Sequence, residues 1–207
     1  MSSRTATRSP QCQHCTGRLP NLARADARFC SSACRQAAYR ERRAAETGGM
    51  PREMTQKARW VRYSARKVPL TTHGKPASST NPATWSDFPR VHRSRVGVGP
   101  GYVLAKQDGI VCLDLDHVVR EDGTLVEWAA ALLQLVPATY IEVSRSGGGL
   151  HVFGKGMLPG RGRRWSYADG TGLEVYVDAR YIAMTGQRWK DAPARLADLG
   201  EVLATLV

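Results

Sequence analysis

Short apolar runs alternate with polar and glycine-rich segments through the second half of the chain. Runs typical of β-strands occupy five segments, at residues 109–118, 139–144, 150–154, 173–177 and 181–186. Residues 125–136 repeat apolar side chains at helical spacing, and residues 193–207 repeat Leu and Val in the same way. This mixture predicts an α+β fold, in which the first helix joins two strands as a right-handed β-α-β crossover.

The first half of the chain is patterned differently. Residues 46–51 combine Gly-Gly with Pro, which marks a break, so we place a boundary near Gly48. The basic run MTQKARWVRYSAR follows and is predicted to be helical, and residues 68–89 are predicted to form an ordered loop because they are rich in Pro, Ser and Thr. The predicted organisation is a basic module of residues 1–48, a basic linker or helix of residues 49–67, and a main domain of residues 68–207.

Positive charge is concentrated before the main domain. The chain has a formal net charge of +12, and residues 1–67 carry 15 Lys and Arg against 4 Asp and Glu, whereas residues 68–207 carry 15 against 14. Lys and Arg gain affinity by releasing counterions from phosphates, so we expect a nucleic-acid partner; the alternative is a basic arm that serves solubility. We expect a cytoplasmic protein without a membrane partner, because residues 1–11 lack the apolar core of a signal peptide and no stretch is long enough to span a bilayer.

The amino-terminal module contains two closely spaced cysteine pairs, Cys12 with Cys15 and Cys30 with Cys34. Two such pairs suit one tetrahedral Zn²⁺, and so short and polar a module needs a metal ion to fold. The alternatives are unrelated thiols, or a site in which His14 replaces one cysteine. The residues after Cys34 are predicted to continue as a helix, and Cys112, inside an apolar strand, is predicted to be a packed core thiol.

Three carboxylates fall on predicted strands. Asp114 and Asp116 lie two residues apart, so both point to one face while the apolar residues around them point to the other. The same alternation places Glu174 with Tyr176 on one face of residues 173–177. Neighbouring carboxylates repel unless a cation or proton lies between them, and Mg²⁺ or Mn²⁺ meets this need with oxygen ligands. Solvated carboxylates at a strand end are the alternative.

A run of three glycines lies just before His151. Residues 147–149 are all Gly, which allows a close backbone approach to a ligand, and His151 opens the next strand. His151 is either a ligand contact or a structural histidine. Arg180 follows a short turn and is predicted to hold a phosphate or to form an ion pair with Asp178 or Glu174.

Taken in order, these motifs (D-L-D, S-G-G-G-L-H and L-E-V-Y-V-D-A-R-Y) resemble the primase-polymerase (prim-pol) family of the archaeo-eukaryotic primase superfamily, in its phage and plasmid type. The resemblance covers residues 68 to about 189. It implies an RRM-like catalytic sheet and nucleotidyl transfer with two Mg²⁺ or Mn²⁺ ions. It also implies a single-stranded or primed DNA template, NTP or dNTP substrates, and a separate replicative helicase, since no ATPase motif is present.

The resemblance assigns roles to individual residues. Asp114 and Asp116 match the first metal motif, Glu174 matches the third acid, and His151 matches the histidine that contacts the phosphates of the incoming nucleotide. Further nucleotide-binding candidates are Arg145, Ser146, Lys155 and Arg180. The chain has Gly149 where relatives commonly have Ser, so we expect that serine contact to be lost or taken over by Ser146.

The function expected is therefore that of a DNA primase/polymerase from a phage, plasmid or other mobile element, acting in the cytoplasm of its bacterial host. Two alternatives use the same features. A metal-dependent nuclease would use the same acids, although the E-x-K pair frequent in nucleases is absent, since Val175 and Tyr176 follow Glu174. A zinc-dependent DNA-binding adaptor for replication would need no intact acid set.

Overall fold

The computed structural model describes residues 11–24, 26–159 and 162–206, with the side chains of residues 41–46 left out. The chain divides into two compact units, Met1–Thr47 and Gly48–Val207. The prediction that residues 1–11 are not a signal peptide falls almost entirely on residues 1–10, which lie outside the described residues. In the part that is described, no helix has the length and apolar character needed to cross a membrane.

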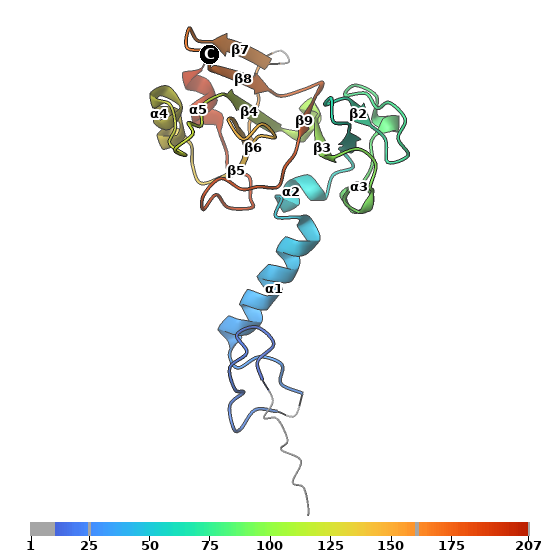
Figure 1. The fold of residues 1–207 in the computed structure, drawn as a ribbon, viewed down its shortest axis with the longest axis vertical. Helices are drawn as coiled ribbons and strands as arrows, with labels where there is room; N and C mark the ends of the chain where they lie inside the picture. Colours follow the sequence, from blue (N-terminus) through green and yellow to red (C-terminus); the bar gives the residue numbers. More distant parts are fainter. Residues whose placement is uncertain (1–10, 25, 160–161, 207) are drawn as a thin grey trace, which may run out of the picture. The chain divides into compact units, whose positions relative to one another are not determined.

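In its described residues, the first unit consists of a cysteine-containing loop region followed by one long helix, α1 (Ser32–Thr47), drawn in blue in Figure 1. This confirms the helix predicted after Cys34. The Ser31 side chain caps the helix, because its Oγ accepts a hydrogen bond from the backbone N–H of Cys34 at 3.1 Å. The cap fixes Cys34 in the first turn of α1.

The second unit is built on two antiparallel sheets. The first sheet has the strand order β2-β1-β3-β9, formed by β1 (Trp60–Tyr63), β2 (Pro69–Leu70), β3 (Gly99–Leu104) and β9 (Arg180–Ala183). The second has the order β5-β6-β4-β8-β7, formed by β4 (Ile110–Asp116), β5 (Tyr140–Val143), β6 (Leu150–Lys155), β7 (Gly162–Ser166) and β8 (Gly172–Tyr176). The helices of this unit are α2 (Arg52–Thr55), α3 (Phe88–Arg93), α4 (Glu127–Leu135), α5 (Gly200–Thr205) and the 3-10 turns η1 (Pro82–Thr84) and η2 (Lys106–Asp108).

One face of the five-stranded sheet is covered by helices. Leu113 and Leu115 of β4 point to this face and pack with Leu132 of α4 and Leu203 of α5, and Figure 1 shows both helices on the same side of the sheet. Burying each such leucine stabilises the fold by about 1.5–3 kcal/mol. This core fixes the register of β4, and with it the opposite direction of Asp114.

The other face of the same sheet packs against the first sheet along part of its length. Cys112, Tyr140 and Phe153 of the five-stranded sheet join Trp60 and Tyr102 of the four-stranded sheet in a second buried core. Cys112 is fully buried, as the sequence predicts for a core thiol. Towards the other end of β4, the residues on this face are polar, so the two sheets enclose a polar site between them.

The predicted strands and the helix after the D-L-D motif are present. The crossover runs from β4 through α4 to β5, and these two strands are parallel to each other and flank β6. The helix predicted for the basic run of residues 54–66 is wrong, because α2 already ends at Thr55. Trp60–Tyr63 forms a buried strand because Trp60 packs on Tyr102 and Phe88, with ring centroids 5.0 and 4.7 Å apart.

The basic residues of that segment also have an internal role. Lys57 Nζ and Arg59 Nε lie 3.0 and 2.6 Å from the carboxylate of Asp108. The buried Arg62 donates to the carbonyl oxygens of Val96 and Val91. The first two contacts hold the segment before β1 against η2, and those of Arg62 hold β1 against α3 and the segment after it.

Candidate catalytic site

Five charged or titratable residues form one row across the five-stranded sheet. The pairing registers place Glu142 beside His151, His151 beside Asp114, Asp114 beside Glu174, and Glu174 beside Arg164. Residues directly opposite each other on adjacent strands point to the same face, so all five side chains project from one face of the sheet. This is the face that meets the four-stranded sheet.

The predicted acids come together at the centre of this row. One carboxylate oxygen from each of Asp114, Asp116 and Glu174 lies within 4.8 Å of the others. Asp114 is half-buried, Glu174 is buried and Asp116 is exposed. Three carboxylates at this separation provide the oxygen ligands that hard divalent ions prefer, so the group is able to hold a metal ion.

Asp114 experiences the unfavourable electrostatics of the group most directly. Burial raises the pKa of Asp114, and the nearby carboxylates of Asp116 and Glu174 raise it further, whereas His151 lowers it. A raised carboxyl pKa means that the environment disfavours its charged form. A bound cation would relieve this cost.

His151 is held between two carboxylates. Its Nδ1 lies 3.0 Å from Glu142 Oε1, and its Nε2 lies 3.6 Å from Asp114 Oδ1. Burial opposes protonation of the ring, but the hydrogen bond to Glu142 and the charge of Asp114 outweigh it, so the pKa of His151 is raised. The ring is therefore suited to donate a hydrogen bond from Nε2 to an anion.

Glu142 was not among the residues predicted from the sequence. Its side chain is fully buried in β5, and it accepts hydrogen bonds from the Tyr140 hydroxyl and from the backbone N–H groups of Thr185 and Gly186. The signal available in the sequence is a charged residue between Ile141 and Val143 in an otherwise apolar strand. A charged residue at a buried strand position requires partners.

Three side chains that can donate hydrogen bonds surround Glu174. The sequence analysis predicted one of them, Arg180, and missed the other two. Arg164 Nε lies 2.9 Å from Glu174 Oε1, and the Tyr176 hydroxyl donates to Oε2. Arg180 reaches the same carboxylate at 4.0 Å and lies over the Tyr176 ring, with 4.5 Å between its guanidinium carbon and the ring centroid. Of the two alternatives for Arg180, the ion pair with Glu174 is present, although more than half of the arginine side chain stays exposed.

A cavity of about 430 Å³ adjoins the acids between the two sheets. It brings together six of the predicted site residues, namely Asp114, Asp116, Arg145, Ser146, His151 and Arg180. Lys67, Pro69 and Ser79 also line it. The cavity therefore brings two acids together with Lys67, Arg145 and Arg180, and Lys67 is a basic residue that the sequence analysis did not single out.

One glycine of the run, Gly149, has a packing reason that the sequence did not reveal. A side chain at Gly149 would meet the carbonyl oxygen of Leu115 at 2.6 Å and the Ser144 hydroxyl at 2.9 Å. Gly149 is thus required by packing against β4, whereas a side chain at Gly147 or Gly148 would meet nothing within 4 Å, so close approach of a ligand to the run stays a prediction. Ser146 lines the cavity, with its hydroxyl 3.0 Å from that of Ser144.

Arg145 and Lys155 differ in position. Arg145 lines the cavity, donates to the Ala65 carbonyl at 2.8 Å and lies over the Tyr63 ring. Lys155 is exposed at the far end of β6, roughly 13 Å along the strand from His151. Among the described residues Lys155 does not line the cavity, so the structure does not bring it to the predicted nucleotide site.

In the first unit the four predicted cysteines gather, with their sulfur atoms all within 4.8 Å. The Sγ of Cys30 lies 3.6 Å from that of Cys15 and 3.4 Å from that of Cys34. Four thiolates around a tetrahedral zinc ion, with Zn–S of about 2.3 Å, lie about 3.8 Å apart. The cluster has the ligands and approximately the spacing that such an ion requires.

Two thiols of the cluster are shifted in opposite directions, since hydrogen bonds with the neighbouring thiols of Cys34 and Cys15 raise the pKa of Cys30 whereas the backbone lowers that of Cys12. The N–H of Cys15 lowers the pKa of the Cys12 thiol to about 6, although desolvation opposes the shift. Cys12 is thereby ready to coordinate a metal ion at neutral pH, since the thiolate is the ligand form.

Comparison with known proteins adds an independent line of evidence. Residues 42–204 match the family described as bifunctional DNA primase/polymerase, N-terminal. The DNA primase-polymerase of Nitratiruptor phage NrS-1 is 40% identical over 134 residues, an alignment that covers 62% of this chain and 18% of the phage protein. The family match extends beyond residues 68–189 at both ends and includes the three acids, Glu142 and His151. The chain therefore belongs to the Prim-Pol family, the bifunctional DNA primase/polymerase N-terminal domains.

Proposed function

We propose that this chain is a DNA-templated nucleotidyl transferase that makes primers or extends them on single-stranded or primed DNA. The observation that carries the proposal is the meeting of Asp114, Asp116 and Glu174 beside a cavity lined by basic and hydroxyl side chains. A nucleoside triphosphate is a polyanion, so it needs cations and hydrogen-bond donors around its phosphates. Both are present on the same side of the acids.

The three acids would hold two Mg²⁺ or Mn²⁺ ions. When bound, these ions activate the 3′-hydroxyl and neutralise charge on the triphosphate and the leaving pyrophosphate. In the reaction, the 3′-oxygen forms a bond to the α-phosphorus, the bond to pyrophosphate breaks, and the hydroxyl proton passes to solvent. Arg164 and Tyr176 orient Glu174 through their contacts with its carboxylate.

Substrate binding falls to the cavity residues. His151 would donate from Nε2 to a phosphate oxygen, and Arg145 and Arg180 would supply positive charge at the rim of the cavity. Ser146, which lines the cavity, would contribute the hydroxyl that Gly149 lacks. NTP and dNTP are both candidate substrates.

We also assign the four cysteines to one structural Zn²⁺, and the five-stranded sheet to the RRM-like class. The strand order β8-β4-β6-β5, with α4 joining β4 to β5, supports that class. A cytoplasmic site of action, replication of a mobile element and a separate helicase are expectations from the family resemblance. These three expectations concern the replication system as a whole rather than the catalytic site.

Primer extension tests the proposal against its alternatives. A labelled primer on a DNA template is incubated with the full chain, nucleotides and Mg²⁺ or Mn²⁺. Growth of the primer in register with the template supports the transferase, shortening supports a nuclease, and template binding without change supports an adaptor. The lack of a lysine two residues after Glu174 disfavours the nuclease.

A further inference from the structure

We propose that Glu142 is the positioning residue of His151: it holds the histidine so that Nε2 faces the cavity, and ties that histidine to the turn that follows β9. The inference rests on the proposed function, in which His151 contacts the triphosphate. It concerns a residue outside the three acids and outside the motifs that carry the family resemblance.

The carboxylate of Glu142 is fixed by donors on every side. Its Oε1 lies 3.0 Å from Nδ1 of His151 and accepts the backbone N–H of Thr185 at 3.1 Å. Its Oε2 accepts the Tyr140 hydroxyl at 2.8 Å and the backbone N–H of Gly186 at 2.9 Å. With no exposure to solvent, this carboxylate has exchanged its hydration for four protein donors.

Two of those donors determine the tautomer of His151. A backbone N–H only donates, so both oxygens of Glu142 accept hydrogen bonds, and an ionised carboxylate has no proton to donate to His151. Nδ1 of His151 must then carry a proton and donate it to Oε1, which directs Nε2 towards Asp114 and the cavity. A glutamine at this position would place its NH₂ group against the N–H of Thr185 or of Gly186 in either orientation.

The same carboxylate joins the two sheets. Thr185 and Gly186 follow β9 of the four-stranded sheet, whereas Glu142 and Val143 belong to the five-stranded sheet. Thr185 also donates its hydroxyl to the Val143 carbonyl at 2.7 Å. The contact therefore sets the orientation of His151 and, at the same time, the spacing of the sheets that form the cavity walls.

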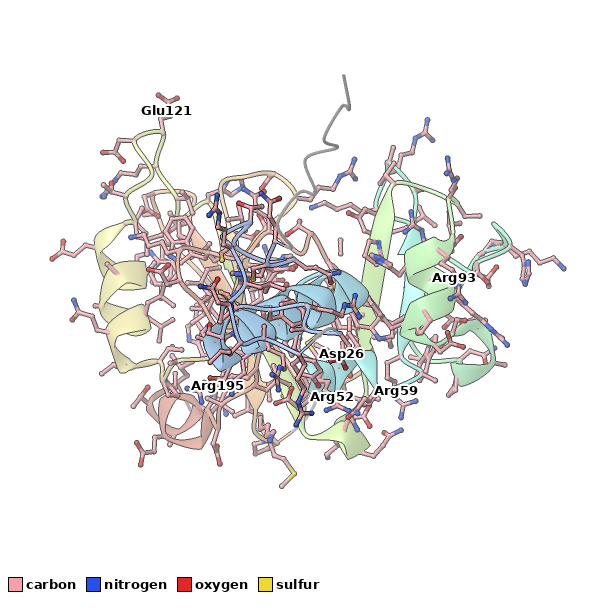
Figure 2. All side chains as sticks on the ribbon, turned by 90° about the horizontal axis from the view of Figure 1, so that it is seen from below. Asp26, Arg52, Arg59, Arg93, Glu121 and Arg195 are labelled. Carbon is pink, nitrogen blue, oxygen red and sulfur yellow. The ribbon has the colours of Figure 1, made fainter. Side chains whose placement is uncertain are left out.

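The first test needs no nucleotide, catalytic metal or activity. In protein labelled with ¹⁵N-histidine and kept free of divalent metal at the acids, NMR should find the His151 Nδ1 protonated, with a proton protected from exchange. Glu142→Gln should remove that protection, whereas Glu121→Gln, at an exposed site labelled in Figure 2, should leave it unchanged. An unprotonated Nδ1 in the natural chain, which needs no variant to fold, overturns the proposal.

The second test measures nucleotide use. Glu142→Gln should raise the KM for the incoming nucleotide by about 10–100-fold, with a smaller change in kcat and unchanged DNA affinity, because a misaligned His151 loses its hydrogen bond to a charged phosphate. Glu142→Asp, which keeps the charge, should recover part of the loss. Equal losses in DNA and nucleotide binding would mean a purely structural role. A protected Nδ1–H in a chain without synthesis activity would reject the proposed function and leave the Glu142–His151 contact standing.

A different observation supports a second inference, about the DNA path. A groove of about 740 Å³ is lined by three arginines, Arg90, Arg93 and Arg95, together with Thr72, His73, Ser94 and Val96. None of the described residues that line it is acidic, although Asp87 lies 3.3 Å from Arg90. Such a cluster stands out because residues 68–207 carry almost equal numbers of acidic and basic residues.

The residues of the groove are held by hydrogen bonds, and the groove lies next in sequence to β2, which reaches the cavity. The Ser94 hydroxyl donates to the Thr72 carbonyl, and Arg62 anchors the Val96 carbonyl at 2.6 Å. Thr72 and His73 follow β2, whose Pro69 lines the cavity beside the acids. We infer that this groove holds the phosphate backbone of the template strand as it runs to the cavity.

Salt-dependent binding of single-stranded DNA tests this inference. Arg93→Gln with Arg95→Gln should weaken binding and flatten the slope of log K against log salt by about 1.4, since each lost phosphate contact contributes about 0.7. Lys190→Gln with Arg195→Gln removes the same charge from exposed sites, and Figure 2 shows Arg195 on the other side of the view from Arg93. Equal slopes in the two double variants would contradict the inference and leave the groove to a protein partner.

Discussion

His151 and Asp114 occupy the same register position on neighbouring strands, with Nε2 of the histidine 3.6 Å from Oδ1 of the aspartate. The contact joins the two functional parts of the site, because Asp114 belongs to the acid group and His151 to the proposed nucleotide pocket. It also means that a cation bound by Asp114 and a phosphate bound by His151 would be neighbours.

The two aspartates should behave alike in synthesis and differently in stability. Asp114→Asn and Asp116→Asn should each reduce metal-dependent synthesis by at least about 100-fold, because each removes a ligand charge. Asp114→Asn should also raise the melting temperature of the metal-free chain by about 2–4 °C, the shift expected from one kcal/mol in a domain of this size. Asp116 is exposed, so its variant should melt close to the natural chain.

Primer extension and thermal melting in EDTA check these expectations, with Asp191→Asn at an exposed site as the control. Normal synthesis by either variant would contradict the site assignment. A large loss of stability in Asp114→Asn would show that this carboxylate is held by structural contacts instead.

The pH dependence of stability follows from the raised pKa of Asp114. A carboxyl whose pKa is higher in the folded chain binds its proton more tightly there, so stability is full at low pH and falls as pH rises through the folded pKa. In metal-free protein, the stability advantage of Asp114→Asn should therefore vanish as the pH falls towards the ordinary carboxyl pKa of 3.8. Denaturant titrations at a series of pH values measure this difference, and a constant difference would contradict the assignment.

His151 should affect the nucleotide more than the template. His151→Asn should raise the KM for the incoming nucleotide by about 10–100-fold, as expected when one hydrogen bond to a charged group is lost, and leave DNA affinity nearly unchanged. His151→Ala should in addition destabilise the fold, because it removes one of the four donors to the buried Glu142 carboxylate. Nucleotide kinetics and DNA titrations separate the two effects, and parallel losses in both would indicate a structural histidine.

The first unit should support template binding without taking part in the chemistry. Residues 1–47 carry nine Lys and Arg against three Asp and Glu, and four thiolates with one Zn²⁺ leave a net charge of about +4. Deleting them should weaken template binding, flatten its salt dependence, and impair initiation more than extension, because initiation has no primer duplex to hold the template. Removal of zinc with Mg²⁺ in excess should reproduce the defect.

Two results would contradict this view of the first unit. If the chain that begins at Gly48 binds and initiates like the full chain, the cysteine unit serves another partner. If the shortened chain loses all extension activity, the units depend on each other for function. Circular dichroism of the shortened chain provides the folding control.

Features with local causes were predictable from the sequence. The strand carrying Asp114, the helix after it and the cysteine cluster follow from periodicity and short spacing, which involve only neighbouring residues. The helix predicted at Trp60 failed because tertiary packing on Tyr102 and Phe88 outweighed local pattern. Strand order and register depend on distant pairs, which no local pattern fixes.

Glu142 shows most clearly what could not be predicted at the site. Its partners lie nine residues away at His151 and more than 40 residues away at Thr185 and Gly186. Only the cross-strand register turns an isolated charged residue into a positioning group. In the same way, Lys155 lies close to His151 in sequence but is carried out of the cavity by the extended strand.

The most direct measurement of the central claim is synthesis on single-stranded DNA of defined sequence, with labelled nucleotides and either Mg²⁺ or Mn²⁺. The account predicts products whose sequence is complementary to the template, formed by the natural chain and lost in Asp114→Asn, while both chains bind the template equally. Products independent of template sequence, equal products from both chains, or no product from a folded and template-bound natural chain would contradict it.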